Sequence, residues 1–236
     1  MSPSEQPQVS IIIPCTDSLV IGWLLEALRP QVEQMHAAEV LVIGTDARRL
    51  VRPGGAVRFI PTGAEAACAS DKRNLGMQLA QGEYFLFLDD DCIPDPGWLE
   101  GLLVHLEGGK RVVGGSVHFA RQNYLQLADN LSAFHDLLPY TPPGERPYLA
   151  TANLGVQRSV VKKVGGMPPG RNRADDLEWT QRMRSAGYGL FFDPRLSILH
   201  DPPRRDFASV WRHWTGDAPH TLRVRLRYAA WLRTPR

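Results

Sequence analysis

Apolar positions follow two different periods along the first hundred residues. Short runs of β-branched and other apolar residues, typical of buried strands, occupy residues 9–13, 40–43, 57–60 and 84–88. Between them, apolar residues recur at helical spacing over 19–35, where Pro30 interrupts the pattern, and over 64–80, which Gly82 closes. Strands that alternate with helices predict an α/β fold with a parallel, doubly wound sheet.

The second half of the chain has a less regular pattern. It predicts, in order, a strand, a helix, a Pro/Gly-rich loop, a helix and a strand over residues 112–117, 124–138, 139–147, 175–186 and 189–192. Residues 1–8 are polar and contain two prolines, which is typical of a disordered terminus. We therefore expect one domain over residues 9–203, followed by a tail over 204–236.

The composition is that of an ordinary globular domain. Of the 236 residues, 43% are hydrophobic and 22% are charged, enough for one sizeable core. The net charge of +2 is too small to indicate binding to nucleic acid, so we expect no such partner. No apolar run approaches the roughly 20 residues of a membrane-spanning helix. The N-terminus also lacks a signal-peptide pattern.

The three cysteines give information about the cellular compartment and do not indicate a metal site. Cys15, Cys68 and Cys92 show no metal-ligand spacing, and three cysteines cannot all pair with one another. This usage favours a reducing, cytoplasmic location.

The most informative stretch is "FLFLDDDCIPDPGWLE", where an apolar strand runs into Asp89, Asp90 and Asp91. In doubly wound sheets, ligands bind beyond the carboxyl ends of the strands. Consecutive carboxylates repel one another, so a strand end holds them at low cost only with a cation, and oxygen ligands favour Mg²⁺ or Mn²⁺. The alternative is a solvated acidic turn before Pro94, but the apolar strand that precedes the triplet favours a metal site.

A second acidic pair, Asp175 and Asp176, opens the predicted helix "ADDLEWTQRMRSAGYG". A carboxylate at a helix start either stabilises the helix dipole or, if it faces a cleft, acts as a general base. Trp179 lies three residues beyond Asp176 on the same helix face, where it either stacks on a substrate ring or packs in the core.

Three basic side chains near these motifs each have a structural alternative. His200 follows a predicted strand and is either structural or a neutral imidazole ligand beside the carboxylates. Arg73, in "SDKRNLG", either neutralises a diphosphate or lies on a solvated helix face. We expect Lys72 to lie in solvent.

Five of these segments, in this order and spacing, resemble the inverting family 2 glycosyltransferases of GT-A fold. The resemblance extends over residues 9–203. It rests on "VSIIIPC", "KRNLGMQLAQGEYFLFLDDDCIPDPGWLE", "ANLGVQRSVVKKVGGM", "DDLEWTQRMRSAGYGLFFDP" and the histidine at position 200. It implies a single GT-A (Rossmann-like) domain with a mainly parallel sheet. Residues 9–100 would form the nucleotide-sugar-binding half and residues 101–203 the acceptor-binding half.

The resemblance also implies roles for individual residues. Asp176 would be the general base that deprotonates an acceptor hydroxyl. A Mn²⁺ or Mg²⁺ ion would be held by Asp91, with Asp89 and His200. The nucleotide-sugar donor would be bound by Pro14, Cys15, Thr16, Asp17, Asp46, Arg73, Asp89 and Asp90. The acceptor would be contacted by Asp175, Trp179 and Asn153. The metal would stabilise charge on the leaving nucleoside diphosphate while the base activates the attacking oxygen.

Departures from the family pattern leave the donor and acceptor open. The aspartate pair that usually follows the second strand is replaced by Gly44 and Thr45, with Asp46 one step later. The aromatic residue often found in the first loop is Thr16, and the usual Glu-Asp pair is Asp175-Asp176. The acceptor would be a glycan, a lipid-linked molecule or a small molecule.

Two other functions remain as alternatives. A nucleotidyltransferase can use a similar sheet, but it usually has a Gly-rich, basic phosphate loop after the first strand, and "IIIPCTDS" has no glycine or lysine. A non-catalytic nucleotide-sugar-binding subunit would not need to keep both Asp91 and Asp176.

The tail from 204 to 236 is basic and amphipathic. This part of the chain contains eight arginines but only two acidic residues, Asp206 and Asp217. Trp211, Trp214 and Trp231 lie among the arginines in the sequence. Apolar residues have helical spacing over 209–214 but alternate over 222–228, which leaves the form of the second stretch open. The pattern suits an anionic membrane surface or a lipid-phosphate acceptor. The alternative is packing on the domain or on a partner chain, as in a homodimer.

Overall fold

A computed structural model gives the structure of residues 6–35, 37–63, 66–120, 123–202, 206–216 and 218–232. Residues 1–5 of the N-terminal segment and residues 204–205, 217 and 233–236 of the tail lie outside the described residues, as do residues 64–65 of the second predicted helix. The described strands are β1 (Val9–Thr16), β2 (Ala38–Thr45), β3 (Val57–Pro61), β4 (Tyr84–Leu88), β5 (Cys92–Pro94), β6 (Val112–Phe119), β7 (Gly144–Glu145), β8 (Asn153–Gln157) and β9 (Phe191–His200).

Helices connect most of these strands. They are α1 (Ile21–Met35), α2 (Ala69–Leu79), α3 (Trp98–Glu107), α4 (Tyr124–Phe134), α5 (Arg158–Val164), α6 (Asp175–Ser185), α7 (Phe207–Gly216), α8 (Ala218–Arg227) and α9 (Ala229–Leu232). Among the described helices, none is long and apolar enough to cross a membrane.

All the strands form one mixed sheet. Its order is β3-β2-β1-β4-β8-β6-β9-β5, with β7 paired to β9. The strands β3, β2, β1 and β4 are parallel, as the pattern of the first hundred residues predicts. Beyond β4 the expectation of a mainly parallel sheet needs correction, because β8 runs antiparallel to both β4 and β6.

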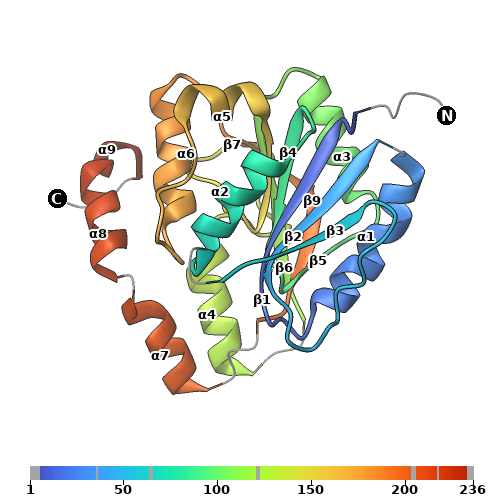
Figure 1. Ribbon diagram of the computed structural model, residues 1–236. Helices are drawn as coiled ribbons and strands as arrows, with labels where there is room; N and C mark the ends of the chain where they lie inside the picture. The colour runs from blue at the N-terminus through green and yellow to red at the C-terminus, as the bar shows by residue number, and fades with distance from the viewer. Residues whose placement is uncertain are drawn as a thin grey trace.

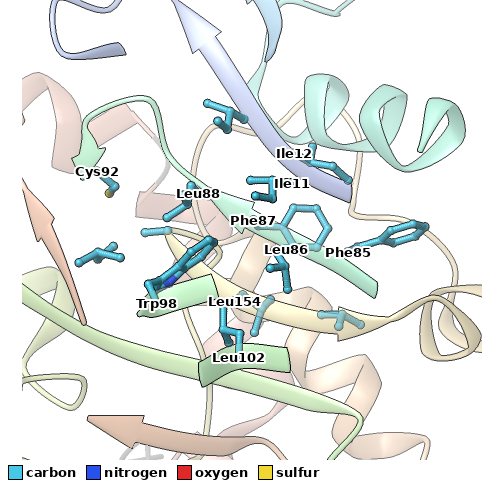
Figure 2. Packing of buried hydrophobic residues seen from close by; sticks show 14 of the residues in the cluster. Ile11, Ile12, Phe85, Leu86, Phe87, Leu88, Cys92, Trp98, Leu102 and Leu154 are labelled. Carbon is cyan, nitrogen blue, oxygen red and sulfur yellow. The ribbon is translucent and has the colours of Figure 1, made fainter. Parts of the chain in front are cut away.

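The core lies on both faces of this sheet. Ile11 and Ile12 of β1 and residues 85–88 of β4 are buried, and Trp98 and Leu102 of α3 pack near them (Figure 2). Gly76 lets α2 lie close to the sheet, because a Cβ there would stand 2.5 Å from a methyl group of Ile12. This close approach brings the first turn of α2 towards the carboxyl end of β1.

The helices cover the sheet in two layers. Figure 1 shows α2 and α6 on one face and α1 and α3 on the other. The C-terminal helices α7, α8 and α9 lie beside α4 and α6 rather than on the sheet (Figure 1). The stretch 222–228, whose form the sequence left open, is helical up to Arg227 within α8.

Candidate active site

The three consecutive aspartates lie directly beyond the carboxyl end of β4, as predicted. All three are half-buried and line one cleft of about 370 Å³. The cleft also contains Thr16 from the end of β1, His200 from the end of β9, and Asp176 from the start of α6. Four elements distant in sequence therefore meet at one edge of the sheet.

A buried arginine joins the two acidic motifs. Arg73 of α2 forms an ion pair with Asp89 and donates from Nη1 to Asp175 Oδ2 at 3.0 Å. Burial alone would lower the pKa of Arg73, but the charges of Asp89 and Asp175 raise it above its usual value. Arg73 therefore does not lie on a solvated helix face; it is a buried cation that holds α6 against the end of β4.

A second buried cation, Lys72, supports the loop after β1. Its Nζ donates to the carbonyl of Cys15 at 2.8 Å and to Oγ1 of Thr16 at 2.6 Å. The backbone N–H of Thr16 in turn donates to Asp90 Oδ2 at 2.8 Å. Burial lowers the pKa of Lys72, and the nearby charge of Asp90 opposes that shift. The expectation that Lys72 lies in solvent is therefore wrong: the close packing of α2 buries it.

Asp90 points towards β1. Burial, together with the charge of Asp91, raises the pKa of Asp90 to about 7, and the Thr16 N–H bond opposes the shift. Ser18 Oγ also donates to the Asp90 carbonyl at 2.7 Å. The middle carboxylate of the triplet is therefore tied to the loop that follows β1.

Asp91 and His200 form the part of the site best suited to a metal ion. Asp91 Oδ2 lies 3.5 Å from His200 Nε2. His200 Nδ1 lies 2.7 Å from the amide oxygen of Asn130, an acceptor, so Nδ1 carries the hydrogen. In the neutral ring this leaves the lone pair on Nε2, facing the Asp91 carboxylate. Two electron-pair donors directed at one point are suited to a cation.

The neighbouring Cys92 is a poorer ligand. Ligand atoms of Asp91, Cys92 and His200 lie within 4.8 Å of one another. However, Cys92 is fully buried, and that burial, with the charge of Asp91, raises its pKa well above its ordinary value. A neutral thiol binds hard cations weakly. Asp89 is not among the residues of this cluster, and its Oδ1 is already paired with Arg73. The donor set therefore fits a divalent cation through Asp91 and His200, with Asp89 further away.

Asp176 occupies the first turn of α6. The residue just before α6, Ala174, has φ +54°, a left-handed conformation that is unfavourable for a residue with a side chain and that turns the chain into the helix. Asp176 Oδ1 accepts from the N–H of Leu177 at 2.7 Å. Burial, and then the charge of Asp175, raise the pKa of Asp176 to about 6. Asp175 is more deeply buried and is occupied by Arg73, so Asp176 is the better candidate for a base.

Several predicted site residues do not line the cleft. The Cys15 side chain is buried in the core, and burial raises its pKa to about 12. Asp17 and Asp46 accept backbone N–H bonds within neighbouring loops, from Ala47 and from Leu50 and Val51 respectively. Of the predicted nucleotide-binding residues of the loop after β1, Pro14 and Thr16 do line the cleft.

Asn153 and Trp179 are also core residues. Asn153 accepts from Trp98 Nε1 at 2.8 Å and donates both amide hydrogens, to the carbonyls of Ser116 and Leu196, so this buried side chain has no donor left for a ligand. Trp179 is fully buried, donates to the Gly165 carbonyl, and packs edge-on against Phe87. Both placements argue against acceptor contacts by these side chains.

The C-terminal helices also contribute residues to the cleft. Trp214 and Arg225 line the cleft together with Tyr148. Trp214 Nε1 donates to the buried carboxylate of Asp129 on α4 at 2.6 Å, which fixes α7 on the domain. The alternation of residues 222–228 concealed the helix that carries Arg225. Of the two alternatives for the tail, packing on the domain holds for the inner face of α7 and α8, which also lines the cleft.

Comparisons with known proteins identify the family and the fold. A model of the family described as "Glycosyl transferase family 2" matches residues 57–165. "Glycosyltransferase AglE" of Haloferax volcanii is 30% identical over 216 residues, covering 88% of this chain and 70% of the relative. The "Pre-mycofactocin glycosyltransferase" of Mycobacterium tuberculosis is 28% identical over 138 residues, covering 55% of this chain but only 29% of the relative. The crystal structure of TarS from S. aureus matches with a TM-score of 0.62 at 15% identity, over 96% of this chain and 43% of that chain.

Fold and site together define an α/β glycosyltransferase. The chain belongs to glycosyl transferase family 2. The GT-A fold and the enzyme class predicted from the sequence are thereby confirmed.

Proposed function

We propose that this protein is a metal-dependent, inverting glycosyltransferase that moves a sugar from a nucleoside-diphosphate sugar to an acceptor hydroxyl. The observation that carries the proposal is the placement of two chemically different carboxylate sites in one cleft. Asp91 faces His200 at 3.5 Å, while Asp176 stands on α6 beyond the Arg73 bridge. One site is suited to a cation and the other to a proton.

Asp91 and His200 would hold the divalent ion. When bound, such an ion stabilises the negative charge that develops on the departing diphosphate. An imidazole in the donor set favours Mn²⁺ over Mg²⁺, which prefers oxygen ligands alone. Thr16, Pro14 and Asp89 line the same part of the cleft and would contact the nucleotide.

Asp176 would act as the general base. It accepts the proton of the acceptor hydroxyl as that oxygen forms a bond to the anomeric carbon, and the bond from this carbon to the diphosphate oxygen breaks. Attack on the face opposite the leaving group inverts the anomeric configuration. With a pKa of about 6, Asp176 is still largely charged near neutral pH. Because this pKa is raised, Asp176 is also a stronger base than an ordinary aspartate.

A thermal-shift panel tests the metal and donor parts of this proposal. The protein is heated with UDP, GDP, CDP or dTDP, each with Mn²⁺, with Mg²⁺ or with chelator. We expect at least one nucleotide to stabilise the protein only with metal, by about 2.7 kcal/mol at 100 times its dissociation constant. Asp91→Ala should lose that metal-dependent shift and keep its fold. Equal stabilisation in chelator, or in the variant, would remove Asp91 from the site.

We also propose that the outer face of the C-terminal helices contacts an anionic membrane surface. Large apolar side chains of α7 and α8 remain exposed although the inner faces of these helices pack on the domain: Phe207, Trp211, Leu222 and Leu226. Phe207 and Trp211 stack on each other, and Arg212 and Arg227 are exposed on the same two helices. Each basic residue near an anionic membrane contributes about 1 kcal/mol.

Liposome flotation separates this proposal from an oligomer contact. Vesicles of phosphatidylcholine with and without phosphatidylglycerol are compared at low salt. We expect binding only with the anionic lipid, weakened by Trp211→Ala. If the protein ignores anionic vesicles, the outer face is a structural surface or a contact with a second copy, which the oligomeric state in solution would show.

A further inference from the structure

The cation that α8 brings to the cleft has no partner of opposite charge. Arg225 is half-buried and lines the cleft. Among the described residues, no carboxylate lies within ion-pair distance of its guanidinium. Two of the acidic groups of the cleft, Asp89 and Asp175, are paired with Arg73 instead. A partly desolvated guanidinium in a concave site is best matched by an anion.

A second arginine lines the same cleft in a fixed orientation. Arg173, just before α6, donates from Nη1 to the His213 carbonyl at 3.2 Å. Its guanidinium lies 4.3 Å from the ring centre of Trp214, a cation–π contact that holds its plane. Because Trp214 is itself bonded to Asp129, the α6 and α7 sides of the cleft are fixed together.

Arg225 lines the same cleft as the candidate base. Tyr148 and Asp176 are both lining residues of that cleft, together with Arg225. Burial raises the pKa of the Tyr148 phenol, and the charges of Asp136 and Asp176 add to this shift, while the charge of Arg225 opposes it.

We propose that Arg225 and Arg173 form an anion subsite for a phosphate group carried by the acceptor. The proposal rests on the function proposed above and names the class of its acceptor: a hydroxyl compound with a phosphate close to the hydroxyl that is glycosylated. Two guanidinium groups suit a phosphate because each offers paired N–H donors that match its oxygens. Binding at this subsite would bring the acceptor hydroxyl to Asp176.

The same chemistry could come from the donor, whose diphosphate also carries phosphate oxygens. The experiment must therefore separate the two sources. Binding of glycerol 3-phosphate is measured by thermal shift in chelator, with glycerol as the uncharged control and ionic strength held constant with sodium chloride. Variants are Arg225→Gln, Arg225→Lys, Asp91→Ala and, as the matched control on the same helix, the exposed Arg223→Gln.

We expect saturable stabilisation by glycerol 3-phosphate and none by glycerol. Arg225→Gln should raise the dissociation constant about 10-fold or more, as for loss of a charged hydrogen bond. Arg225→Lys should keep part of the affinity, while Arg223→Gln and Asp91→Ala should behave like the wild type. This pattern would assign the subsite to the acceptor.

Three results would overturn the proposal. One is the absence of saturable stabilisation, and another is wild-type affinity in Arg225→Gln. The third is a clear rise in glycerol 3-phosphate affinity in Asp91→Ala, which, without metal, would show that the phosphate lies beside that carboxylate in the donor site. The proposed function is tested separately, by the metal-dependent nucleotide binding described above. The glycerol 3-phosphate assay contains neither metal nor nucleotide, so the two proposals can fail independently.

Discussion

Removing the Arg73 cation should destabilise the protein strongly at neutral pH. The Arg73 side chain is 5% exposed and lies between Asp175, 4% exposed, and Asp89, 30% exposed. Arg73→Met fills the same space but leaves Asp175 as a buried charge without a counterion. Breaking a buried pair in this way costs about 3–5 kcal/mol. For a chain of this size, such a loss lowers Tm by about 6–20 °C.

The pH dependence follows from the same pair. Without Arg73, the folded-state pKa of Asp175 rises further above its unfolded value, because burial already raises it in the wild type. A carboxyl group whose pKa is higher in the folded state destabilises that state most at pH values above its folded pKa. The destabilisation shrinks as the pH falls below the folded pKa, and it disappears below the unfolded pKa. The gap between wild type and Arg73→Met should therefore be large at pH 7.5 and shrink towards pH 5.

Urea unfolding at both pH values measures this gap. The double variant Arg73→Met/Asp175→Asn is the control, because removing the orphaned charge should recover more than half of the lost stability. A loss below about 1 kcal/mol at pH 7.5 would show that the pair contributes no more than an exposed salt bridge. The same conclusion would follow if the loss did not change with pH.

Four further outcomes follow from the site. Asp176→Asn should keep donor affinity but lower kcat by about 10² to 10⁴-fold, and full turnover would refute its role as base. Asp175→Asn should lower kcat less than Asp176→Asn and should mainly reduce stability in urea unfolding. The value of kcat/KM should rise as the pH increases through about 6 and then level off, because only the charged form of Asp176 accepts a proton. An undiminished kcat/KM at pH 5 would contradict this. Lys72→Met should cost about 1–3 kcal/mol in stability and raise KM for the donor, and an unchanged KM would show that the Thr16 loop does not need this support.

The parts of the fold that could be predicted are those in which local pattern and tertiary structure agree. The run at 84–88 is buried on both faces, so its continuous apolar character identifies a central strand, and the aspartates mark its carboxyl end. By contrast, residues 153–157 form β8 within "ANLGVQ", a segment with a glycine and an asparagine. Gly155 is required there because its position faces Leu86, Leu102 and Leu106 at close range, which only the assembled sheet shows.

The titratable residues of the site could be predicted from the sequence, but the side chains that pair with them could not. The sequence identified Asp91, His200 and Asp176 as titratable groups that share a site. It did not show that Lys72 and Arg73 are buried, because two adjacent basic residues in a helix are typical of a solvated helix face. Their burial depends on Gly76, which lets α2 approach β1 closely enough to cover both cations.

The insertion of β8 between β4 and β6 has a consequence for how the chain folds during synthesis. The strands β1 to β4 can pair as they emerge, but the free edge of β4 must wait for residues 153–157. Roughly 65–70 residues separate the two partners, so at about 5–20 residues per second the edge stays open for several seconds. An apolar strand with unpaired backbone groups is a template for pairing with other chains. Nascent chains of this protein should therefore be most prone to aggregate, and most dependent on chaperones, between the emergence of Leu88 and that of Gln157.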